Sequence, residues 1–323
     1  MESMEIDQVT EEFVTDLAGR ITQSIESVMQ DSSEAVEAAL ITLFAGGHLL
    51  IEDVPGVGKT TLATALGKAI DAGVRRLQFT SDMLPADVTG LSIFQQDTHE
   101  FVFHPGPIFS NIVIGDEINR ATPKTQSALL EAMAERSVTI DGHTRRLPEL
   151  FLVVATQNPS DMAGTFPLPE AQRDRFMARI SLGYPGADTE IAMLRSRTAR
   201  DPLRSLAPVA TIAEVVRAQR AVDDVHLSEA AARYLVAIVT ATRQHRALEL
   251  GASPRASLHL AQMARARALL HGRNFVTADD IAVLAGPVLG HRLLPRGYFA
   301  TEQDAGSAVE AALSEIVANT RVE

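Results

Sequence analysis

Residues 51–61 contain the amino-acid types needed to hold a polyphosphate. They read Ile-Glu-Asp-Val-Pro-Gly-Val-Gly-Lys-Thr-Thr, with an apolar run from His48 to Ile51 before the glycines and a helix-forming run, 62–70, after them. Glycine lets backbone N–H groups approach an anion closely, and the first turn of a helix adds partial positive charge. In such a turn Lys59 would reach the β- and γ-phosphates, and the Thr60 hydroxyl would ligate Mg²⁺.

One position departs from the usual pattern G-x-x-x-x-G-K-[ST], which has glycine where this chain has Asp53. The inner part of the pattern is intact. Pro55 has no N–H to donate, so the donors must come from residues 57–61. The expected nucleotide-binding residues of this turn are Pro55, Gly56, Val57, Gly58, Lys59, Thr60 and Thr61.

Two carboxylates follow a second apolar run, at Asp116 and Glu117. An apolar run ending in acidic residues is typical of a buried parallel strand, whose carboxyl end is where ligands bind in α/β folds. Asp116 can join Thr60 as a magnesium ligand through water. Glu117 can polarise a water for attack on the γ-phosphorus. An acidic pair can also serve only a helix dipole, but the glycine turn upstream favours the catalytic interpretation.

Composition indicates a globular protein that is large enough for two domains. The chain has 323 residues, of which 46% are hydrophobic and 22% charged. Asp and Glu number 41 against 29 Lys and Arg, so the formal charge is −12. This acidity argues against nucleic-acid binding, and with only Lys59, Lys68 and Lys124 present a basic stripe would have to be built from arginine.

The absence of cysteine excludes disulfides and thiol-ligated zinc. The first residues, Met-Glu-Ser-Met-Glu, lack the basic-then-apolar order of a signal peptide. The longest apolar stretch, 35–51, is interrupted by a glutamate, two glycines and a histidine, so it is not a membrane span. We therefore expect a cytoplasmic protein without a membrane span.

The N-terminal part of the chain alternates between predicted strands and helices. Apolar residues at helical spacing predict helices over 11–29 and 33–45. Thr122 and Pro123 supply an N-cap and first-turn proline. The alternation predicts a parallel α/β sheet. The further expected elements are strands 48–52, 74–80, 111–117 and 151–158, helices 59–71 and 123–135, and hairpins 88–107 and 136–148.

The C-terminal part has no strong strand pattern after residue 188. We therefore predict two domains, an α/β nucleotide-binding domain with N-terminal helices over 1–184 and a helical domain over 185–323. The expected helices of the second domain are 188–199, 211–222, 228–245, 255–271, 278–288 and 302–319.

Several longer strings resemble the MoxR family of AAA+ ATPases. They are Gly-Asp-Glu-Ile-Asn-Arg-Ala (115–121), Pro-Lys-Thr-Gln-Ser-Ala-Leu-Leu-Glu-Ala-Met (123–133), Ala-Thr-Gln-Asn-Pro (155–159), Gly-Thr-Phe-Pro-Leu-Pro-Glu-Ala-Gln (164–172) and Gly-Ala-Ser-Pro-Arg-Ala (251–256). The resemblance runs from about residue 30 to 290. It implies a P-loop AAA+ parallel sheet flanked by helices and followed by an all-helical lid.

The resemblance also implies roles for single residues. The segments with Lys59 and Asp116 correspond to the Walker A and Walker B motifs. Asn158 matches sensor 1, which places the attacking water. Arg175 matches the arginine finger given to a neighbouring subunit, and Arg255 matches sensor 2, which links the lid to the γ-phosphate. Without the resemblance, each arginine would more simply be a surface ion-pair partner, and the asparagine a turn former before a proline.

Three positions depart from the pattern of the family. Arg173 stands where an apolar residue is usual, so Arg173 and Arg175 compete for the finger role, and we prefer Arg175. Gln30-Asp31-Ser32 replaces the common Val-Gly-Gln, which leaves the adenine contacts open. Asp53 replaces the outer glycine of the phosphate-binding turn.

The two hairpins resemble the insertions of this family, which are expected to face the channel of a ring. Leu91, Ile93 and Phe94 lie on a segment too short to bury them alone. Two alternatives are open: the hairpin grips a client protein, or it packs on the body of its own chain. The resemblance implies ATP and Mg²⁺ as cofactors and a homo-oligomeric, expectedly hexameric ring. It also implies a client protein, with a von Willebrand factor A domain protein as one partner and chaperone-like maturation or metal-cofactor insertion as the role. The alternative is a DNA-directed AAA+ motor, which net acidity disfavours.

Overall fold

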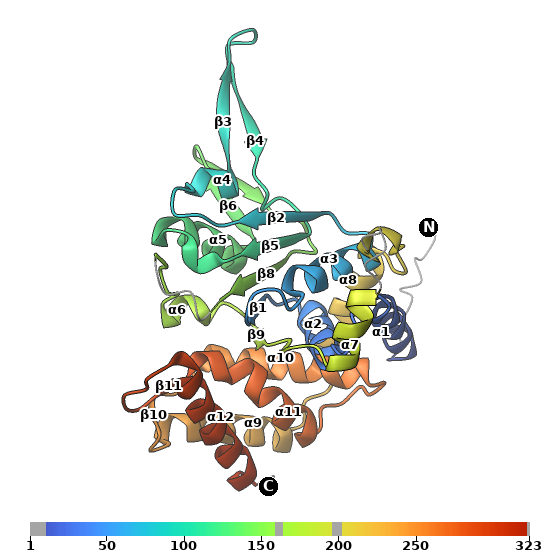
Figure 1. The fold of residues 1–323 in the computed structure, drawn as a ribbon, viewed down its shortest axis with the longest axis vertical. Coiled ribbons are helices and arrows are strands. Elements are labelled where there is room, and N and C mark those ends of the chain that lie inside the picture. The colour runs from blue at the N-terminus through green and yellow to red at the C-terminus, as the bar shows by residue number, and fades with distance from the viewer. Residues whose placement is uncertain (1–10, 159–163, 196–201, 322–323) are drawn as a thin grey trace, which may run out of the picture.

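A parallel sheet of five strands forms the centre of the N-terminal half. The computed structural model describes residues 11–158, 164–195 and 202–321. All neighbouring strands of this sheet run parallel, which confirms the predicted α/β class. In spatial order the strands are β2 (Val74–Gln78), β5 (Ile112–Asp116), β8 (Leu152–Gln157), β1 (Leu49–Glu52) and β9 (Ala178–Ile180) (Figure 1).

Successive residues of the central strands point to opposite faces of the sheet, as strand geometry requires. Leu49 and Ile51 pack in one buried cluster with helices α1 to α3, whereas Leu50 packs in a second cluster with helix α5. Burial on both faces explains why these strands read as continuous apolar runs. The covering helices are α1 (Glu11–Glu26), α2 (Ser33–Phe44), α3 (Lys59–Ala69) and α5 (Pro123–Glu135).

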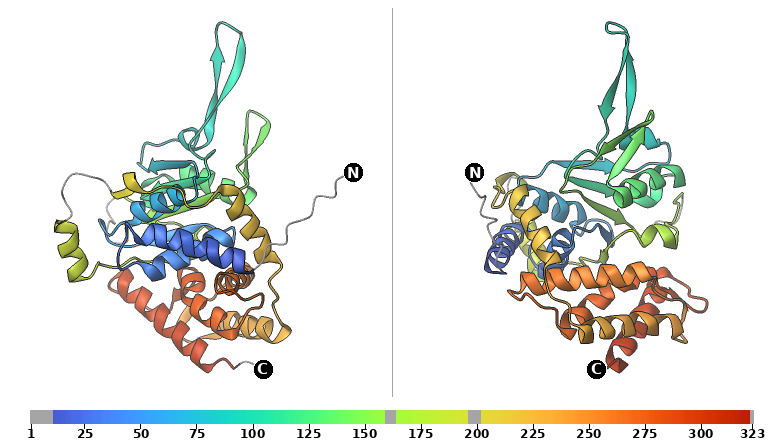
Figure 2. Two further views of the ribbon diagram at one scale, coloured as in Figure 1. Left: turned by 90° about the vertical axis from the view of Figure 1, so that its right-hand side faces the viewer. Right: turned by 180° about the vertical axis from the view of Figure 1, so that it is seen from behind.

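Two hairpins extend from the same end of this sheet (Figure 2). The longer one follows the short helix α4 (Pro85–Thr89) and pairs β3 (Gly90–Gln95) with β4 (Glu100–Pro105). The shorter one pairs β6 (Ser137–Ile140) with β7 (His143–Arg146). Leu91, Ile93 and Phe94 of the longer hairpin are each between 44% and 48% exposed, so this hairpin does not pack them on the body of the chain.

The C-terminal half is helical. The helices start at residues with capping side chains, for example Thr211 and Thr277, each of which forms a capping box with an acidic residue three positions later. The prediction of a helix over 188–199 is met as far as Arg195, and its last four residues lie outside the described part of the chain. The helices are α7 (Ala187–Arg195), α8 (Ile212–Asp223), α9 (Glu229–Gln244), α10 (Pro254–Leu270), α11 (Ala278–Leu289) and α12 (Glu302–Asn319).

Several short elements were not predicted from the sequence. They are β9, the pair β10 (Leu248–Leu250) and β11 (Leu294–Pro295), the helices α4 and α6 (Glu170–Arg173), and the 3-10 turns η1 (Ile118–Arg120), η2 (Pro202–Ser205) and η3 (Gly290–Arg292). Each has two to five residues. Such lengths are too short for a period of apolar residues to stand out.

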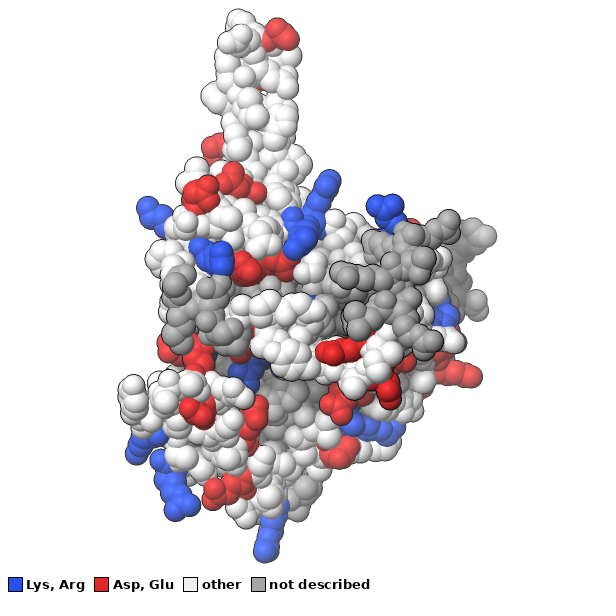
Figure 3. All heavy atoms as spheres, in the orientation of Figure 1, with Lys and Arg blue, Asp and Glu red and all other residues white. Residues whose placement is uncertain are grey.

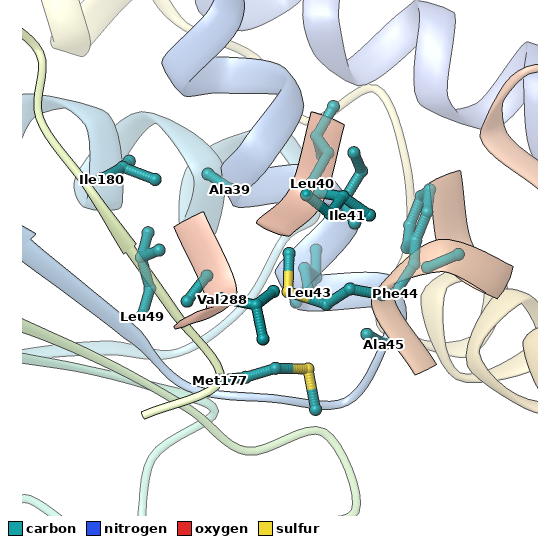
Figure 4. Packing of buried hydrophobic residues seen from close by; sticks show 14 of the residues in the cluster. Ala39, Leu40, Ile41, Leu43, Phe44, Ala45, Leu49, Met177, Ile180 and Val288 are labelled. Atoms are coloured by element: carbon teal, nitrogen blue, oxygen red, sulfur yellow. The ribbon is translucent and has the colours of Figure 1, made fainter. Parts of the chain in front are cut away.

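One apolar cluster continues from the α/β half into the helical half. Met177 and Val288 lie with Leu43 and Ala45 near the end of α2 (Figure 4), and all four belong to this cluster. The N-terminal helices α1 and α2 also pack against α10. The division near residue 184 therefore stays a prediction. Within the described residues, no helix is long and apolar enough to cross a membrane.

Candidate functional site

The strand order brings the predicted motifs to one edge of the sheet. Strand β8 lies between β1, which leads into the glycine turn, and β5, which ends in Asp116. Glu52 at the end of β1 is in register with Gln157 at the end of β8. Because the strands are parallel, their carboxyl ends meet at a common edge, where α/β folds bind ligands.

The glycine turn has the backbone conformation that its sequence requires. Gly56 and Gly58 have φ angles of 88° and 101°, a region that residues with a Cβ rarely adopt. A Cβ on Gly56 would meet no atom within 4 Å, so the angle and not crowding selects glycine there. Helix α3 begins directly at Lys59, which aligns the helix N-terminus with the turn as an anion site requires.

The ammonium group of Lys59 lies against backbone carbonyls at this edge. It donates to the carbonyl oxygen of Asp53 and to those of Val54 and Gln157, each of the latter two at 3.2 Å. Partial burial lowers the pKa of Lys59, and three nearby carboxylates act in the opposite direction. The lysine is thus held beside the turn and next to the end of β8.

Asp116 and Thr60 place a carboxylate and a hydroxyl oxygen side by side at this edge. The Thr60 Oγ1 atom lies 3.2 Å from Asp116 Oδ1, and Asp116 is only 5% exposed. Thr156 Oγ1 donates to the same carboxylate at 3.3 Å, and Arg76 Nε donates to Oδ2. Hydroxyl and carboxylate oxygens are ligands that Mg²⁺ accepts, so the residues present fit this ion.

Glu117 has an unusual backbone conformation. Its φ and ψ are 55° and 51°, the left-handed region, which is uncommon for a residue other than glycine. The Glu117 N–H donates to Thr156 Oγ1 at 3.1 Å. Its carboxylate accepts from Gln78 Nε2 at 3.1 Å and lies 2.9 Å from Arg120 Nε. These contacts hold the carboxylate at the edge of the sheet, beside Asp116 but outside the buried strand.

Asn158 directly follows β8 and is partly buried. Its strand lies between those that lead into Lys59 and Glu117, so the asparagine is at the centre of the edge rather than at its side.

The three arginines lie on two separate segments. Arg175 Nη1 donates to the carbonyl oxygen of Leu130 in α5. Arg173 Nη2 lies 3.9 Å from Glu170 Oε1. Arg255 is exposed in the first turn of α10. In the single chain, Arg173 and Arg175 therefore contact residues of their own segment and of α5.

Asp53 has a clear role despite its departure from the pattern. Its Oδ2 atom accepts hydrogen bonds from Ser181 Oγ, Leu182 N and Gly183 N at 2.7 to 2.8 Å, and Oδ1 accepts from Val54 N at 2.8 Å. Burial raises the pKa of Asp53, but these bonds outweigh it and leave the pKa below its usual value. Asp53 thus ties the start of the glycine turn to residues 181–183, which directly follow β9.

Gln126, in the string 123–133 that follows the carboxylate pair, connects two segments of the site. This side chain is fully buried in α5, and its Nε2 donates to the carbonyl oxygens of Ile118 at 3.2 Å and Phe166 at 2.9 Å. It therefore joins the turn after Glu117 to the segment that leads to Arg175.

The roles of Arg76, Gln78, Thr156 and Arg120 as partners of the two carboxylates were not predicted from the sequence. The first two lie on β2, and only the strand order reveals that β2 pairs with β5, with Gln78 opposite Asp116. Two successive arginines, at 75 and 76, within the predicted strand 74–80 were the one available signal.

The comparisons with known proteins agree with this geometry. A model of the "ATPase family associated with various cellular activities (AAA)" matches residues 48–178, and a model of the AAA lid domain matches residues 240–313. Chaperone MoxR1 of Mycobacterium tuberculosis is 38% identical over 279 residues, which are 84% of this chain and 74% of the relative. The chain belongs to the MoxR family of AAA+ ATPases.

Two further relatives extend the likeness over nearly the whole length of this MoxR-family chain. An uncharacterized protein of Bacillus subtilis, YeaC, is 46% identical over 308 residues, which are 95% of each chain. A crystal structure assigned as an ATPase of Cytophaga hutchinsonii superposes with a TM-score of 0.87 at 33% identity, over 97% of each chain. The predicted fold of a parallel sheet with a helical lid is confirmed.

Proposed function

We propose that this MoxR-family chain hydrolyses ATP with Mg²⁺ and uses the cycle to remodel a partner protein. The observation that carries the proposal is the pair of Thr60 and Asp116, 3.2 Å apart at the edge where the Lys59 ammonium also lies. The N–H groups of residues 57–61 and the N-terminus of α3 would hold the phosphates. Thr60 and Asp116 would hold Mg²⁺, which supplies charge neutralisation at the β- and γ-phosphate oxygens.

Glu117 is the proposed general base. Its position next to the buried Asp116 and its left-handed backbone turn the carboxylate out of the strand, where it can accept a proton from water. Asn158, at the end of the strand between β1 and β5, would orient that water. Arg120 and Gln78 both contact the Glu117 carboxylate in the described chain. At least one of these contacts would have to break during turnover, so that a carboxylate oxygen can accept the proton of the water.

Arg175 is the proposed finger for the nucleotide of an adjacent copy, and Arg255 the proposed lid contact. Arg173 lies near Glu170. Burial and Glu52 raise the pKa of Glu302, whereas the charge of Arg173 lowers it, so Arg173 has a second acidic neighbour. The described partner of Arg175 is instead a neutral carbonyl, so its charge is the more available of the two. An arginine supplied in trans accelerates phosphoryl transfer roughly 10³- to 10⁵-fold, which supports assembly as a ring, proposed to be hexameric.

The proposed client-binding surface is the β3–β4 hairpin, residues 90–105. Besides the residues named above, Phe101 is 73% exposed, and its ring lies 5.3 Å from that of Phe94. The hairpin contains Asp97 and Glu100 but no lysine or arginine, and it is almost uncharged on the face seen in Figure 3. An apolar, slightly acidic projection suits a protein client and repels a nucleic-acid backbone.

The role with the client is proposed as chaperone-like maturation, which includes metal-cofactor insertion, with a von Willebrand factor A domain protein as one partner. The name of the relative from M. tuberculosis, a chaperone, supports the first part. We propose that this MoxR-family chain is located in the cytoplasm.

Steady-state hydrolysis tests the proposal directly. The purified chain should release phosphate from ATP in Mg²⁺ and not in EDTA, and its activity per subunit should rise with protein concentration because the finger comes from another copy. Constant activity per subunit down to the lowest measurable concentration would exclude the shared site. A titration with duplex DNA at low salt is the matched test of the alternative, a DNA-directed motor, and should show no salt-dependent binding.

A further inference from the structure

The segment that carries Arg175 is fixed mainly by residues of the lid. We call residues 174–177 the finger segment, and residues 240–313, which match the lid model, the lid. Arg292 of η3 is 4% exposed and donates from Nε to Asp174 Oδ1 at 2.7 Å. It also donates to the carbonyl oxygens of Phe176 at 2.6 Å and Met177 at 3.3 Å.

A second lid residue contacts the same carboxylate. Ser253 Oγ donates to both oxygens of Asp174 at 3.2 Å. Ser253 is the N-cap of α10, since its Oγ accepts from Ala256 N, and it lies two residues before Arg255. Asp174 directly precedes Arg175, and its carboxylate accepts from Ser253, two residues before Arg255. It therefore links the two segments that carry the proposed functional arginines.

Two histidines beside Arg292 bring no charge of their own to this contact. His291 Nε2 lies 3.1 Å from the Phe176 carbonyl oxygen, and His259 Nδ1 accepts from Arg292 Nη2 at 2.6 Å. Burial lowers the pKa of His259 to about 4, with Arg292 acting in the same direction, so this ring is neutral at pH 7. Asp174 is then the acidic partner of a buried guanidinium, an arrangement that is costly to break from one side.

We propose that Asp174 is a positioning residue that makes the lid, through Arg292 and Ser253, determine where Arg175 and Arg255 lie relative to each other. The inference rests on the proposed function, because it assigns Arg175 to phosphoryl transfer. A movement of the lid then displaces the arginine offered to the adjacent copy. The contact couples the state of one subunit to hydrolysis in the next.

Replacement of Asp174 by asparagine tests the proposal while keeping the size of the side chain. We expect kcat for ATP to fall roughly 100-fold, because a reacting group displaced by about 1 Å costs about that factor. ADP affinity should change less than about threefold, because ADP lacks the γ-phosphate that Arg255 is proposed to contact and Asp174 contacts none of Lys59, Thr60 and Asp116. Glu214→Gln is the matched control, since it weakens another link between the two halves, the 3.0 Å pair of Glu214 with Arg20, and should leave kcat unchanged.

Assemblies of two different variant subunits show whether Asp174 positions Arg175 or only supports folding. A Lys59→Ala subunit cannot use its own site but can supply its Arg175 to an Arg175→Ala subunit, so the mixture should regain activity. The regained activity should fall at least tenfold when Asp174→Asn is added to the Lys59→Ala subunit. It should be unaffected when Glu214→Gln is added instead.

The outcomes are distinguishable. The role of Asp174 is overturned if the mixture regains the same ATPase activity with and without Asp174→Asn in the Lys59→Ala subunit. It is also overturned if kcat of the single Asp174→Asn variant is within twofold of the parent. A lower melting temperature with equal losses of ADP affinity and kcat also overturns it, because that pattern marks a merely structural residue. If the parent chain hydrolyses no ATP, the proposed function fails instead.

Discussion

The edge of the sheet and the β3–β4 hairpin differ in how their polar and apolar groups are satisfied. At the edge, nearly every polar atom named above has a partner within the chain, and Asp116 is buried. On the hairpin, large apolar side chains such as Phe94 and Phe101 are exposed. The edge is therefore organised before any partner arrives, whereas the hairpin has apolar surface that only another molecule could cover. The proposed chemistry and the proposed recognition therefore lie in separate regions of this chain, and substitutions should affect one without the other.

The largest expected effect is at the edge, in Glu117→Gln. Loss of a general base costs roughly 10²- to 10⁴-fold, so turnover should fall at least 100-fold. ATP binding should remain, because the amide has the size of the carboxylate and Lys59 is intact. Phosphate release and ATP titration on the same sample check both. Full turnover in this variant would remove the proposed base.

The next effect concerns the opposite end of β1, where His48 is buried. His48 Nδ1 accepts from Val153 N at 3.0 Å, and burial lowers its pKa to about 4. Between pH 6.5 and 4 the unfolded chain binds a proton at this ring that the folded chain does not, so stability falls as pH falls through this range. The complete effect corresponds to about 3 kcal/mol.

Urea unfolding between pH 7.5 and 4 measures this dependence. The free energy of unfolding should depend less steeply on pH in His48→Gln than in the parent, after allowing for the lower overall stability of the variant. His99→Gln, at an exposed position near the tip of the hairpin, is the control and should keep the slope of the parent. Equal slopes in all three chains would contradict a buried neutral His48.

A smaller effect is expected from Asp53→Gly, which restores the usual pattern of the phosphate-binding turn. The variant loses the acceptor of four hydrogen bonds to Val54 and residues 181–183, so the free energy of unfolding should fall by about 2 kcal/mol. ATP affinity should change only a few-fold. Asp53→Asn, which keeps one carbonyl oxygen, should fall between the parent and the glycine variant. A glycine variant as stable as the parent would show that the tie to residues 181–183 contributes nothing.

The smallest effect on hydrolysis is expected at the hairpin. Replacing Leu91 and Phe94 with serine should leave basal ATPase activity within twofold, because neither residue touches the edge, and should reduce action on a client. Client capture by Glu117→Gln chains with and without the serine substitutions checks this. Gln96→Ser, an exposed polar position of the same hairpin, is the control. Loss of folding in the serine variant would show that the hairpin packs in a way that its exposure does not reveal.

The sequence predicted the long elements well because their signals are local. Helix 123–135 is confirmed at both ends, since Thr122 and Pro123 define its start. Strand β9 was missed because three residues carry no periodic signal. The P-loop fold and the family followed from long strings, and the comparisons bear them out.

The partners of the site residues could not be predicted, because they depend on which strands and segments meet. Arg76 reaches Asp116 only because β2 pairs with β5. Asp53 looked like a defect in a motif until residues 181–183 were seen to donate to it. Asp174 and Arg292 are 118 positions apart, and neither sequence neighbourhood indicates the other. The roles of all the predicted site residues, from Lys59 and Glu117 to Asn158, Arg175 and Arg255, stay predictions.

The most direct test of the account is ATP binding in the presence of millimolar Mg²⁺, measured by calorimetry on the parent chain and on Lys59→Ala. The account predicts saturable one-site binding per chain in the parent that EDTA weakens, and none in the folded lysine variant. A folded parent chain without affinity for ATP, or a lysine variant that binds as well as the parent, would contradict it.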